Sequence, residues 1–415
     1  MPTTHLQSAI RRPACGPGDI VTMPRALRRV VAIRRLLTGR AGAGTALLLG
    51  LTLSGCSATA DAPSTPVTTP PVITAAPAAR IVPINSSWTF SVAATGASLR
   101  YQWRRNGQPI AGATTAQYTV RPTAMTDGGP LDVVVSNAAG AVTTPAVELR
   151  VVTENGPWRT GLRIATSTSP TAFSGFASWV PQAGVASLAA LPGGRVIGVF
   201  QWFPFDDLAS FDRVAVVFSS DSGRTWSAPR RIVVQGFPDT LQRPFDPTIT
   251  VTADGRLRLY YTSSRSDGGR ISGVNGFYSA ISTDGVTYTF EPGARFVATR
   301  STVDCAAIHW NNQWHLVSPI GAPDEGGYHA ISTDGLTFSR LPDISTRGTP
   351  FNVLGNLAIV NGAMRFYGSS PQGIWYADYA ASGSWNAPTL LNGVMGGDPA
   401  VVEAAPGRWL MVVTQ

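Results

Sequence analysis

Short segments in which apolar and polar residues alternate, separated by clusters of turn residues, make up the chain between residues 79 and 152. The run Trp-Thr-Phe-Ser-Val at 88–92 places an apolar side chain at every second position, as in a strand with one buried face. Further strands of this kind are expected at 101–105, 117–120 and 131–137, with Asn106-Gly107 as a hairpin turn. The pattern predicts a small all-β domain over residues 79–152.

A different pattern recurs through residues 155–415, and its clearest copy is Ser-Ser-Asp-Ser-Gly-Arg-Thr-Trp at 219–226. Shorter copies lie at 282–288 and 332–338, and a degenerate copy lies at 383–388. In each full copy Asp and Ser suit the cap of a tight turn, and Gly supplies a positive φ. The aromatic residue is expected to pack between sheets. We therefore predict a structural role, and not a catalytic one, for these aspartates.

Upstream of the turns lies a second repeat, in which a small or acidic residue leads into an apolar strand. Five such segments occur, at 186–189, 245–249, 303–307, 355–359 and 397–401. They recur at intervals close to the length of one propeller blade, so they predict a β-propeller with five blades. The last unit holds too few strands for a blade, and we expect 159–166 to complete it and close the ring.

The first domain resembles a bacterial immunoglobulin-like module. Trp103 stands where the core tryptophan of that fold belongs, and the run Asp127…Gly129…Leu131 resembles the corner before the sixth strand. The disulfide cysteines are absent and Leu131 replaces the usual tyrosine, as is common in bacterial members. The resemblance implies a spacer or a weak binding module. The turns of residues 155–415 resemble the Asp-box of sialidase-like propellers.

Three aspartates form the main candidate site. The first residue of an innermost propeller strand faces the centre, so the alignment places Asp246, Asp304 and Asp398 around one axis, with Ser187 and Asn356 in the other two places. Converging carboxylates repel one another and raise at least one pKa, which provides both an acid and a base for glycoside hydrolysis. The alternative is that these aspartates bond backbone amides or hold a water or an ion, and such a cluster would suit Ca²⁺.

The Asp-Pro pairs at 246–247 and 398–399 resemble those of five-bladed arabinanase- and xylosidase-like glycoside hydrolases. The resemblance implies that acids at these positions act on a sugar. Those enzymes also place a glutamate at the start of an inner strand, whereas here Glu403 lies deeper in its strand and Glu325 lies in a loop. The arginine that begins the first blade of sialidases is absent from 184–189. Two hypotheses stay open: a glycosidase that acts in the central funnel of the propeller, or a glycan-binding or adhesion protein that uses the same funnel without turnover.

The remaining candidates could contact a sugar. Aromatic rings stack on the apolar CH faces of sugars, and we expect Trp202 and Trp310 near the rim of the funnel. Arg243, Glu325 and Asn356 are the candidate polar contacts. The competing expectation is a place in the core for a lone tryptophan and a solvated surface for a loop charge.

An apolar run at 46–53 follows an arginine-rich segment and ends in Leu-Ser-Gly-Cys56. The run is too short for a transmembrane helix. It resembles a bacterial lipoprotein signal over residues 1–55, with translation starting at Met1 or at Met23 and with Cys56 as the lipid acceptor. The resemblance implies export and a lipid anchor in the outer membrane or at the cell surface. Residues 56–78, rich in Pro, Thr and Ala, predict a stiff linker.

The formal net charge is +8, from 32 Lys and Arg against 24 Asp and Glu. Residues 1–55 hold eight arginines and one aspartate, so removal of the signal would leave about +1, and we exclude nucleic acid as a partner. Once Cys56 is acylated and Cys15 is removed with the signal, only Cys305 remains, so we expect no intramolecular disulfide, and the four histidines lack the spacing of a metal site. We expect a monomer with a carbohydrate or glycoconjugate as partner, and no cofactor other than an ion at the axis.

Overall fold

The computed structural model describes residues 68–415 apart from 268–269, 272–274, 299, 301 and 321–324, so the expected signal and Cys56 lie outside the described residues. The described residues form β-strands and two short 3₁₀ helices, and they contain no α-helix. The prediction of an all-β chain is therefore confirmed. Within this part of the chain, no helix is long and apolar enough to cross a bilayer.

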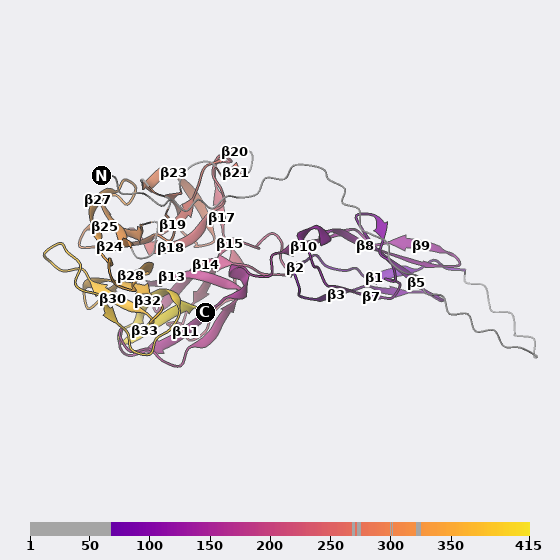
Figure 1. Ribbon diagram of the computed structural model, residues 1–415, viewed down its shortest axis with the longest axis horizontal. Coiled ribbons are helices and arrows are strands. Elements are labelled where there is room, and N and C mark those ends of the chain that lie inside the picture. Colours follow the sequence, from indigo (N-terminus) through magenta and orange to yellow (C-terminus); the bar gives the residue numbers. More distant parts are fainter. Residues whose placement is uncertain (1–67, 268–269, 272–274, 299, 301, 321–324) are drawn as a thin grey trace, which may run out of the picture. The chain divides into compact units, whose positions relative to one another are not determined.

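Residues 72–152 form an immunoglobulin-like domain around one core (Figure 1). Trp103 is fully buried in that core, its ring centroid lies 5.9 Å from that of Tyr118, and its indole N–H donates to the carbonyl of Thr115 at 2.9 Å. Leu131, which replaces the tyrosine that the resemblance implies, is also fully buried in this core. One sheet has the order β2 (Arg80–Pro83), β10 (Val147–Val152), β8 (Gly129–Asn137), β5 (Arg100–Arg105), β6 (Gln108–Pro109), with β9 (Gly140–Thr143) also on β8; β1 (Val72–Ala75) pairs with β4 (Ala93–Thr95), β3 (Trp88–Ser91) pairs with β7 (Gln117–Val120), and η1 is Met125–Asp127.

The rest of the chain, after η2 (Pro157–Arg159), forms five sheets of four or five strands (Figure 1). Two of them, from the inside outwards, are β13 (Ala183–Leu191), β14 (Arg195–Trp202), β15 (Arg213–Ser219), β16 (Arg230–Arg231), and β18 (Phe245–Val251), β19 (Leu257–Ser263), β22 (Gly276–Ser282), β23 (Thr287–Val297), β17 (Val233–Gln235). The next two are β24 (Ala306–Trp310), β25 (Gln313–Pro319), β26 (Gly327–Ser332), β27 (Ser339–Ile344), and β28 (Asn352–Val360), β29 (Ala363–Ser369), β30 (Trp375–Asp378), β31 (Thr389–Leu390). The fifth is β32 (Gly397–Ala405), β33 (Arg408–Thr414), β11 (Gly161–Ser167), β12 (Ala177–Pro181), and a separate pair is formed by β20 (Ser266–Asp267) and β21 (Arg270–Ile271).

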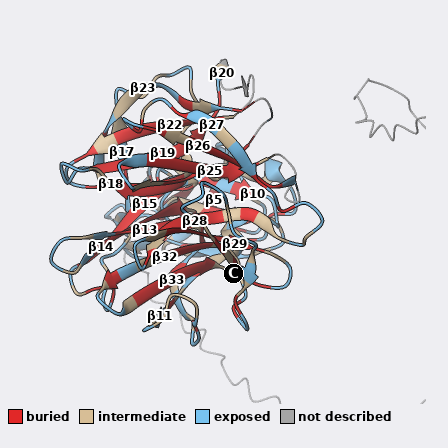
Figure 2. Cartoon of the chain, turned by 90° about the vertical axis from the view of Figure 1, so that its left-hand side faces the viewer, coloured by how far each residue is buried: buried red, intermediate tan, exposed pale blue. Residues whose placement is uncertain are grey.

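The first strands of the five sheets contact one another in a cycle. Strand β13 contacts β18, β18 contacts β24, β24 contacts β28, β28 contacts β32, and β32 contacts β13. Sheets that radiate from such a cycle are the architecture of a β-propeller. Strand β11 pairs with β33 from Leu162 opposite Thr414 to Ser167 opposite Trp409, as expected for the segment that completes the last sheet. Figure 2 shows that these strands are buried along much of their length, with exposed residues gathered in the loops.

The three aspartate turns fold alike. The carboxylate of Asp284 accepts hydrogen bonds from the backbone N–H groups of Val286 and Thr287, each at 2.8 Å. Asp221 and Asp334 accept equivalent backbone bonds at 2.8–3.0 Å. These bonds hold the pKa of all three carboxyls below the usual range. The oxygens serve their own turns, which agrees with the predicted structural role.

The glycine of each turn lies against a neighbouring sheet. Gly335 has a φ of 71°, and a Cβ at this position would lie 2.7 Å from the hydroxyl oxygen of Tyr260 and against the guanidinium of Arg258. The Tyr260 hydroxyl donates to the carbonyl of Gly335 at 2.8 Å, and Arg258 donates to the carbonyl of Asp334 at 2.9 Å. The turn after β26 is therefore joined to β19 of the preceding sheet.

We expect Gly335→Ala to lower the free energy of unfolding by about 2–4 kcal/mol, because the methyl group meets both a left-handed backbone and the neighbouring sheet. Gly348→Ala is the matched control: its φ is 77°, and a Cβ there would have no atom within 4 Å. The control should cost only the backbone term, about 1 kcal/mol. Urea unfolding of both variants measures the difference, and equal losses would contradict a joining role for the turn.

Candidate functional site

Three aspartates lie at the entries of inner strands, and each has a left-handed backbone. The angle φ is 50° at Asp246, 54° at Asp304 and 45° at Asp398. Asp246 and Asp398 lie in β-bulges, where β18 and β32 contain one residue more than the strands they pair with, and Asp304 lies just before β24. Asp and Asn tolerate this conformation better than other non-glycine residues do. The bulge therefore explains a short polar residue at these positions, but it does not explain a charged one.

Strand β13 has the same bulge, between Gly184 and Ser187, and the left-handed residue in it is Val185, with φ 50°. Val185 is thus the equivalent of the three aspartates, and the expectation that Ser187 takes this place is wrong by two residues. An apolar pattern does not reveal a bulge at a strand entry, which is why the alignment slipped. Ser187 lies further along β13, where its hydroxyl accepts a bond from the N–H of Ile249 at 3.2 Å.

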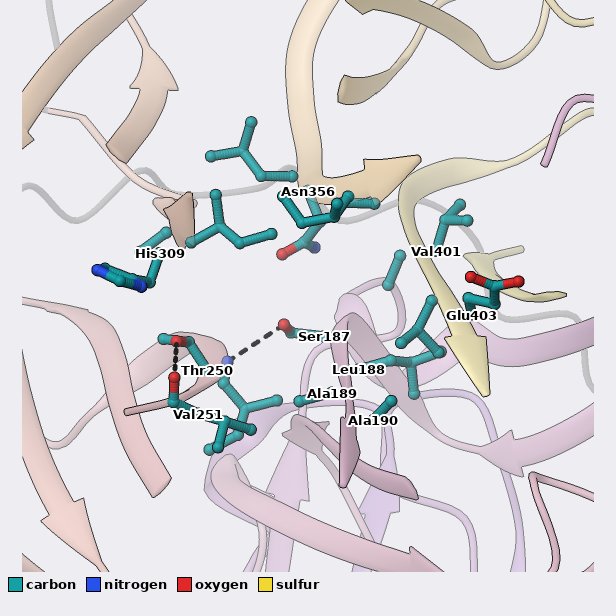
Figure 3. Close-up of a pocket in the computed structure, with 18 of the residues that line it drawn as sticks. Ser187, Leu188, Ala189, Ala190, Thr250, Val251, His309, Asn356, Val401 and Glu403 are labelled. Carbon is teal, nitrogen blue, oxygen red and sulfur yellow. Dashed lines mark hydrogen bonds between the residues drawn. The ribbon is translucent and has the colours of Figure 1, made fainter. Parts of the chain in front are cut away.

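Asn356 also lies away from the aspartates. Its amide donates to the carbonyl of Ala186 at 2.9 Å, and with Ser187 it lines a cavity of about 420 Å³ formed by later residues of the inner strands (Figure 3). In this cavity His309 and Glu403 lie on opposite sides, and the Glu403 carboxylate accepts a bond from its own turn at 2.8 Å. The Ser187 and Asn356 side chains in this cavity hydrogen-bond the backbone of neighbouring inner strands, so we assign the cavity a structural role.

The electrostatics of the three aspartates are coupled. Burial and, after it, the charge of Asp398 raise the pKa of Asp246 to about 7, against the opposing effect of Arg243. Burial also raises the pKa of Asp398, to about 6, and the pKa of Asp304, to which the charges of Asp246 and Asp398 add. Buried carboxyls that interact in this way titrate as a group, so the cluster holds protons at pH values at which a free aspartate is ionised.

The oxygen Oδ1 of Asp304 is buried, and within the described part of the chain no group hydrogen-bonds it. Buried polar atoms nearly always have a partner, because an unpaired one keeps its full desolvation cost. The alternative in which the aspartates only satisfy backbone amides fits Asp246 in part, since the backbone of Asp304 helps to lower its pKa. It does not account for Asp304, whose buried oxygen has no partner among the described residues.

A cavity of about 270 Å³ lies beside Asp246, and Phe245, Asp212 and Arg243 also line it. Arg243 forms an ion pair with the Asp212 carboxylate and donates its Nε–H to the Asp212 carbonyl at 2.8 Å. The buried amide of Gln201 donates to the other oxygen of that carboxylate at 2.8 Å. These bonds fix the guanidinium of Arg243 beside Asp246, at the place where the sequence analysis expected a polar contact.

The other predicted contact residues lie elsewhere. Trp202 is half-buried and packs against the core between β14 and β33. Trp310 donates its indole N–H to a backbone carbonyl of the next sheet at 2.8 Å. Glu325 is exposed and pairs with the exposed Arg300. Of these described residues, none lines the cavity at Asp246.

Asp212 and Gln201 are the residues of this site that the sequence analysis missed. Asp212, with φ 60°, directly precedes the apolar run of β15, which is the same acid-before-strand signal that identified Asp246. We applied that signal only to the first strand of each repeat, whereas Asp212 leads into the third strand of its sheet. Gln201 gives no signal in the sequence, because it is one polar residue in an apolar strand.

The four histidines were expected to form no metal site. Among the described residues, no group of three or more His, Cys, Asp and Glu side chains is arranged to hold a metal ion, so Ca²⁺ at the axis stays a prediction. Two histidines nevertheless meet: His315 Nδ1 lies 3.0 Å from His329 Nε2, inside an aromatic cluster with Tyr379. Burial lowers the pKa of His315 to about 4 and that of His329 to about 3, so the pair is neutral at physiological pH.

No protein-family model matches the chain. A stretch of 91 residues, 21% of this chain, is 41% identical to Endoglucanase C of Cellulomonas fimi, and it spans only 8% of that protein. Among solved structures, a family 117 glycoside hydrolase of the marine bacterium Zobellia galactanivorans is similar over 63% of this chain and 92% of its own, with 12% identity and a TM-score of 0.43. The GH43_1 enzyme of Xanthomonas citri, solved with xylose, is similar over 56% of this chain and 86% of its own, with 12% identity and a TM-score of 0.40.

The aspartate cluster makes the stability of the fold depend on pH. The unfolded chain releases the proton of Asp246 near pH 4, whereas the folded protein holds it to about pH 7, so the free energy of unfolding falls as pH rises through this window. We expect Asp246→Asn to leave Tm unchanged near pH 4 and to raise it by about 2–6 °C at pH 8.

Asp254→Asn is the control with the opposite sign. A hydrogen bond from Thr252 and the nearby Arg256 lower the pKa of this exposed turn carboxyl to about 2. Asp254→Asn should therefore lower Tm at pH 8, where Asp246→Asn is expected to raise it. Thermal unfolding at the two pH values measures both variants. A Tm difference for Asp246→Asn that is the same at pH 4 and pH 8 would show that its carboxyl is not perturbed.

Proposed function

We propose that residues 155–415 form a five-bladed propeller that binds a carbohydrate where Asp246, Asp304 and Asp398 meet, and that hydrolyses a glycosidic bond there. One observation carries this proposal. Three half-buried aspartates occupy left-handed positions at the entries of inner strands, burial raises the pKa of each, and neighbouring carboxylates of the group raise the pKa of Asp246 and Asp304 further. A group of carboxyls that holds one proton while another is ionised is what acid–base cleavage of a glycoside requires.

The charge at these positions is the feature that points to chemistry. An asparagine would fit the same left-handed backbone and would add no repulsion between buried groups. Non-glycine residues in this conformation and like charges out of solvent both reduce stability, and such combinations concentrate at functional sites. Val185, in the equivalent bulge of β13, indicates that the fold itself does not need an acid at this place.

The proposed reaction uses two of the three carboxyls at a time. A protonated carboxyl donates its proton to the glycosidic oxygen as the bond from the anomeric carbon to that oxygen breaks. An ionised carboxylate takes a proton from a water molecule, whose oxygen forms the new bond to the anomeric carbon. Asp304, with an oxygen lacking a partner within the described residues, is positioned to hold that water or a sugar hydroxyl. Arg243, held by Asp212, lies ready to hydrogen-bond the sugar.

The second candidate function is glycan binding or adhesion without turnover. The observation that favours it is the absence of a glutamate from the described residues around the aspartates: Glu403 lies in the other cavity and Glu325 on the exposed surface. The similarity to Endoglucanase C fits a carbohydrate ligand in either case, because an endoglucanase is named for its action on a glucan. The lipid on Cys56 and the linker at 56–78 are part of the same proposal, which has the monomeric protein at the cell surface, where polymeric glycans occur.

The test is a screen of the purified full chain against aryl-glycosides and plant and host polysaccharides. We expect hydrolysis of at least one substrate class, and we expect Asp246→Asn and Asp304→Asn each to lower kcat/KM by about 100-fold or more, the usual effect of removing an acid or base. Asp254→Asn, in an exposed turn, should keep the wild-type rate.

Folding of each variant is checked by Tm, which should not fall for Asp246→Asn. Binding without turnover on every substrate would exclude the hydrolase and leave the binding protein. Retention of the full rate in both aspartate variants would place the reaction outside this cluster.

A further inference from the structure

A second cavity adjoins the one at Asp246 and is lined by positive charge. Its volume is about 220 Å³, and its walls include three arginines, Arg213, Arg231 and Arg243, together with the apolar side chains of Phe237 and Pro244. We call it the arginine pocket. It is smaller than the roughly 300–1,000 Å³ of drug-sized ligand sites, so it suits one sugar ring or one substituent.

The arginine pocket lies at the same end of its sheet as the candidate site. Strand β15 begins at Arg213, and β16, which pairs antiparallel with it through Ala215 and Arg231, ends at Arg231. Arg243 stands just before β18 and lines both cavities. A ligand at Asp246 that extends past Arg243 therefore enters the arginine pocket.

The positive charge of the pocket is incompletely balanced by the protein. Within the described residues, Arg243 has an ion pair with Asp212, whereas Arg213 and Arg231 have none and donate instead to backbone carbonyls, at 2.9 and 2.7 Å. The charge of Arg231 helps to lower the pKa of Asp207, whose oxygens accept bonds from the hydroxyl and N–H of Ser210. Partial burial lowers the pKa of Arg213, the charges of Arg243 and Arg231 lower it further, and the charge of Asp212 opposes this change.

We infer that the arginine pocket binds an anionic substituent of the sugar next to the one at Asp246, so that the ligand is an acidic polysaccharide. Planar guanidinium groups match carboxylate and sulfate oxygens, and Phe237 adds apolar lining beside them. The substituent is either the carboxylate of a uronic acid or a sulfate ester. This inference rests on the proposed function, since it names the ligand class of the same site.

The experiment is calorimetric titration of the full chain with three sets of oligosaccharides: uronic acid oligomers, sulfated galactan oligomers, and neutral arabinan, xylan and glucan oligomers. We expect tighter binding of one acidic set than of any neutral set. Arg213→Gln and Arg231→Gln should each weaken the acidic ligand by about 10-fold, as expected for loss of a charge-assisted hydrogen bond, and leave neutral ligands unchanged. The set that responds distinguishes carboxylate from sulfate.

Arg224→Gln is the matched control, because Arg224 is an exposed arginine in the turn at the other end of the same strand pair. An equal loss in this variant would show general charge attraction and overturn the inference. So would binding of neutral oligomers that is as tight as that of acidic ones, a result that leaves the proposed function intact. If the wild type binds no oligomer, the proposed function fails. Inorganic sulfate then tests the pocket alone, through a rise in Tm that Arg213→Gln abolishes and Arg224→Gln keeps.

Discussion

The backbone at the entry of the inner strands is the constraint on which the arrangement of the candidate site depends. Where a bulge holds one extra residue, that residue takes a left-handed conformation, and its side chain is directed differently from those of a regular strand. The inner strands themselves are fixed by contact with one another around a closed cycle. A strained residue is retained only where its surroundings determine it fully, and the cycle of packed strands provides that determination. Three aspartates can therefore be held close together despite their mutual repulsion.

Two sets of aspartates recur in this chain, and their surroundings give them opposite properties. In the turns, backbone N–H groups point at the carboxylate and lower its pKa, so the charge is stable and the oxygens are used. At the strand entries, burial and neighbouring carboxylates raise the pKa, so the charge is unstable and a proton is held. Regular recurrence in a sequence therefore does not show which carboxyls keep their charge, whereas the number of hydrogen-bond donors that face each carboxylate does.

The sequence was informative wherever a pattern maps directly onto one local structure. Alternation predicted the strands around Trp103, the repeated Ser-Asp-Gly turns predicted one kind of hairpin, and the segment 159–166 was correctly placed beside the last strand. The site was harder to predict. The aspartates were found because each begins an apolar strand, but Ser187 was misplaced because a bulge changes the register without changing the pattern. Trp202 and Trp310 are half-buried and pack against hydrophobic clusters, since an aromatic side chain near a loop can pack on the core as readily as it can face a ligand.

Asp212 interacts both with the arginines and with the aspartate cluster of the candidate site. Arg243 is close enough to lower the pKa of Asp246, and a guanidinium free to move would approach that carboxyl and ionise it fully. The Asp212 carboxylate and carbonyl both accept bonds from Arg243 and hold it back, and the charge of Asp212 itself raises the pKa of Asp246. The Asp212 carboxylate forms its ion pair with Arg243, whereas the guanidinium of Arg213 donates to the backbone carbonyls of Phe211 and Asp212. Asp212 thus raises the pKa of Asp246 and holds the guanidinium of Arg243 in place beside it.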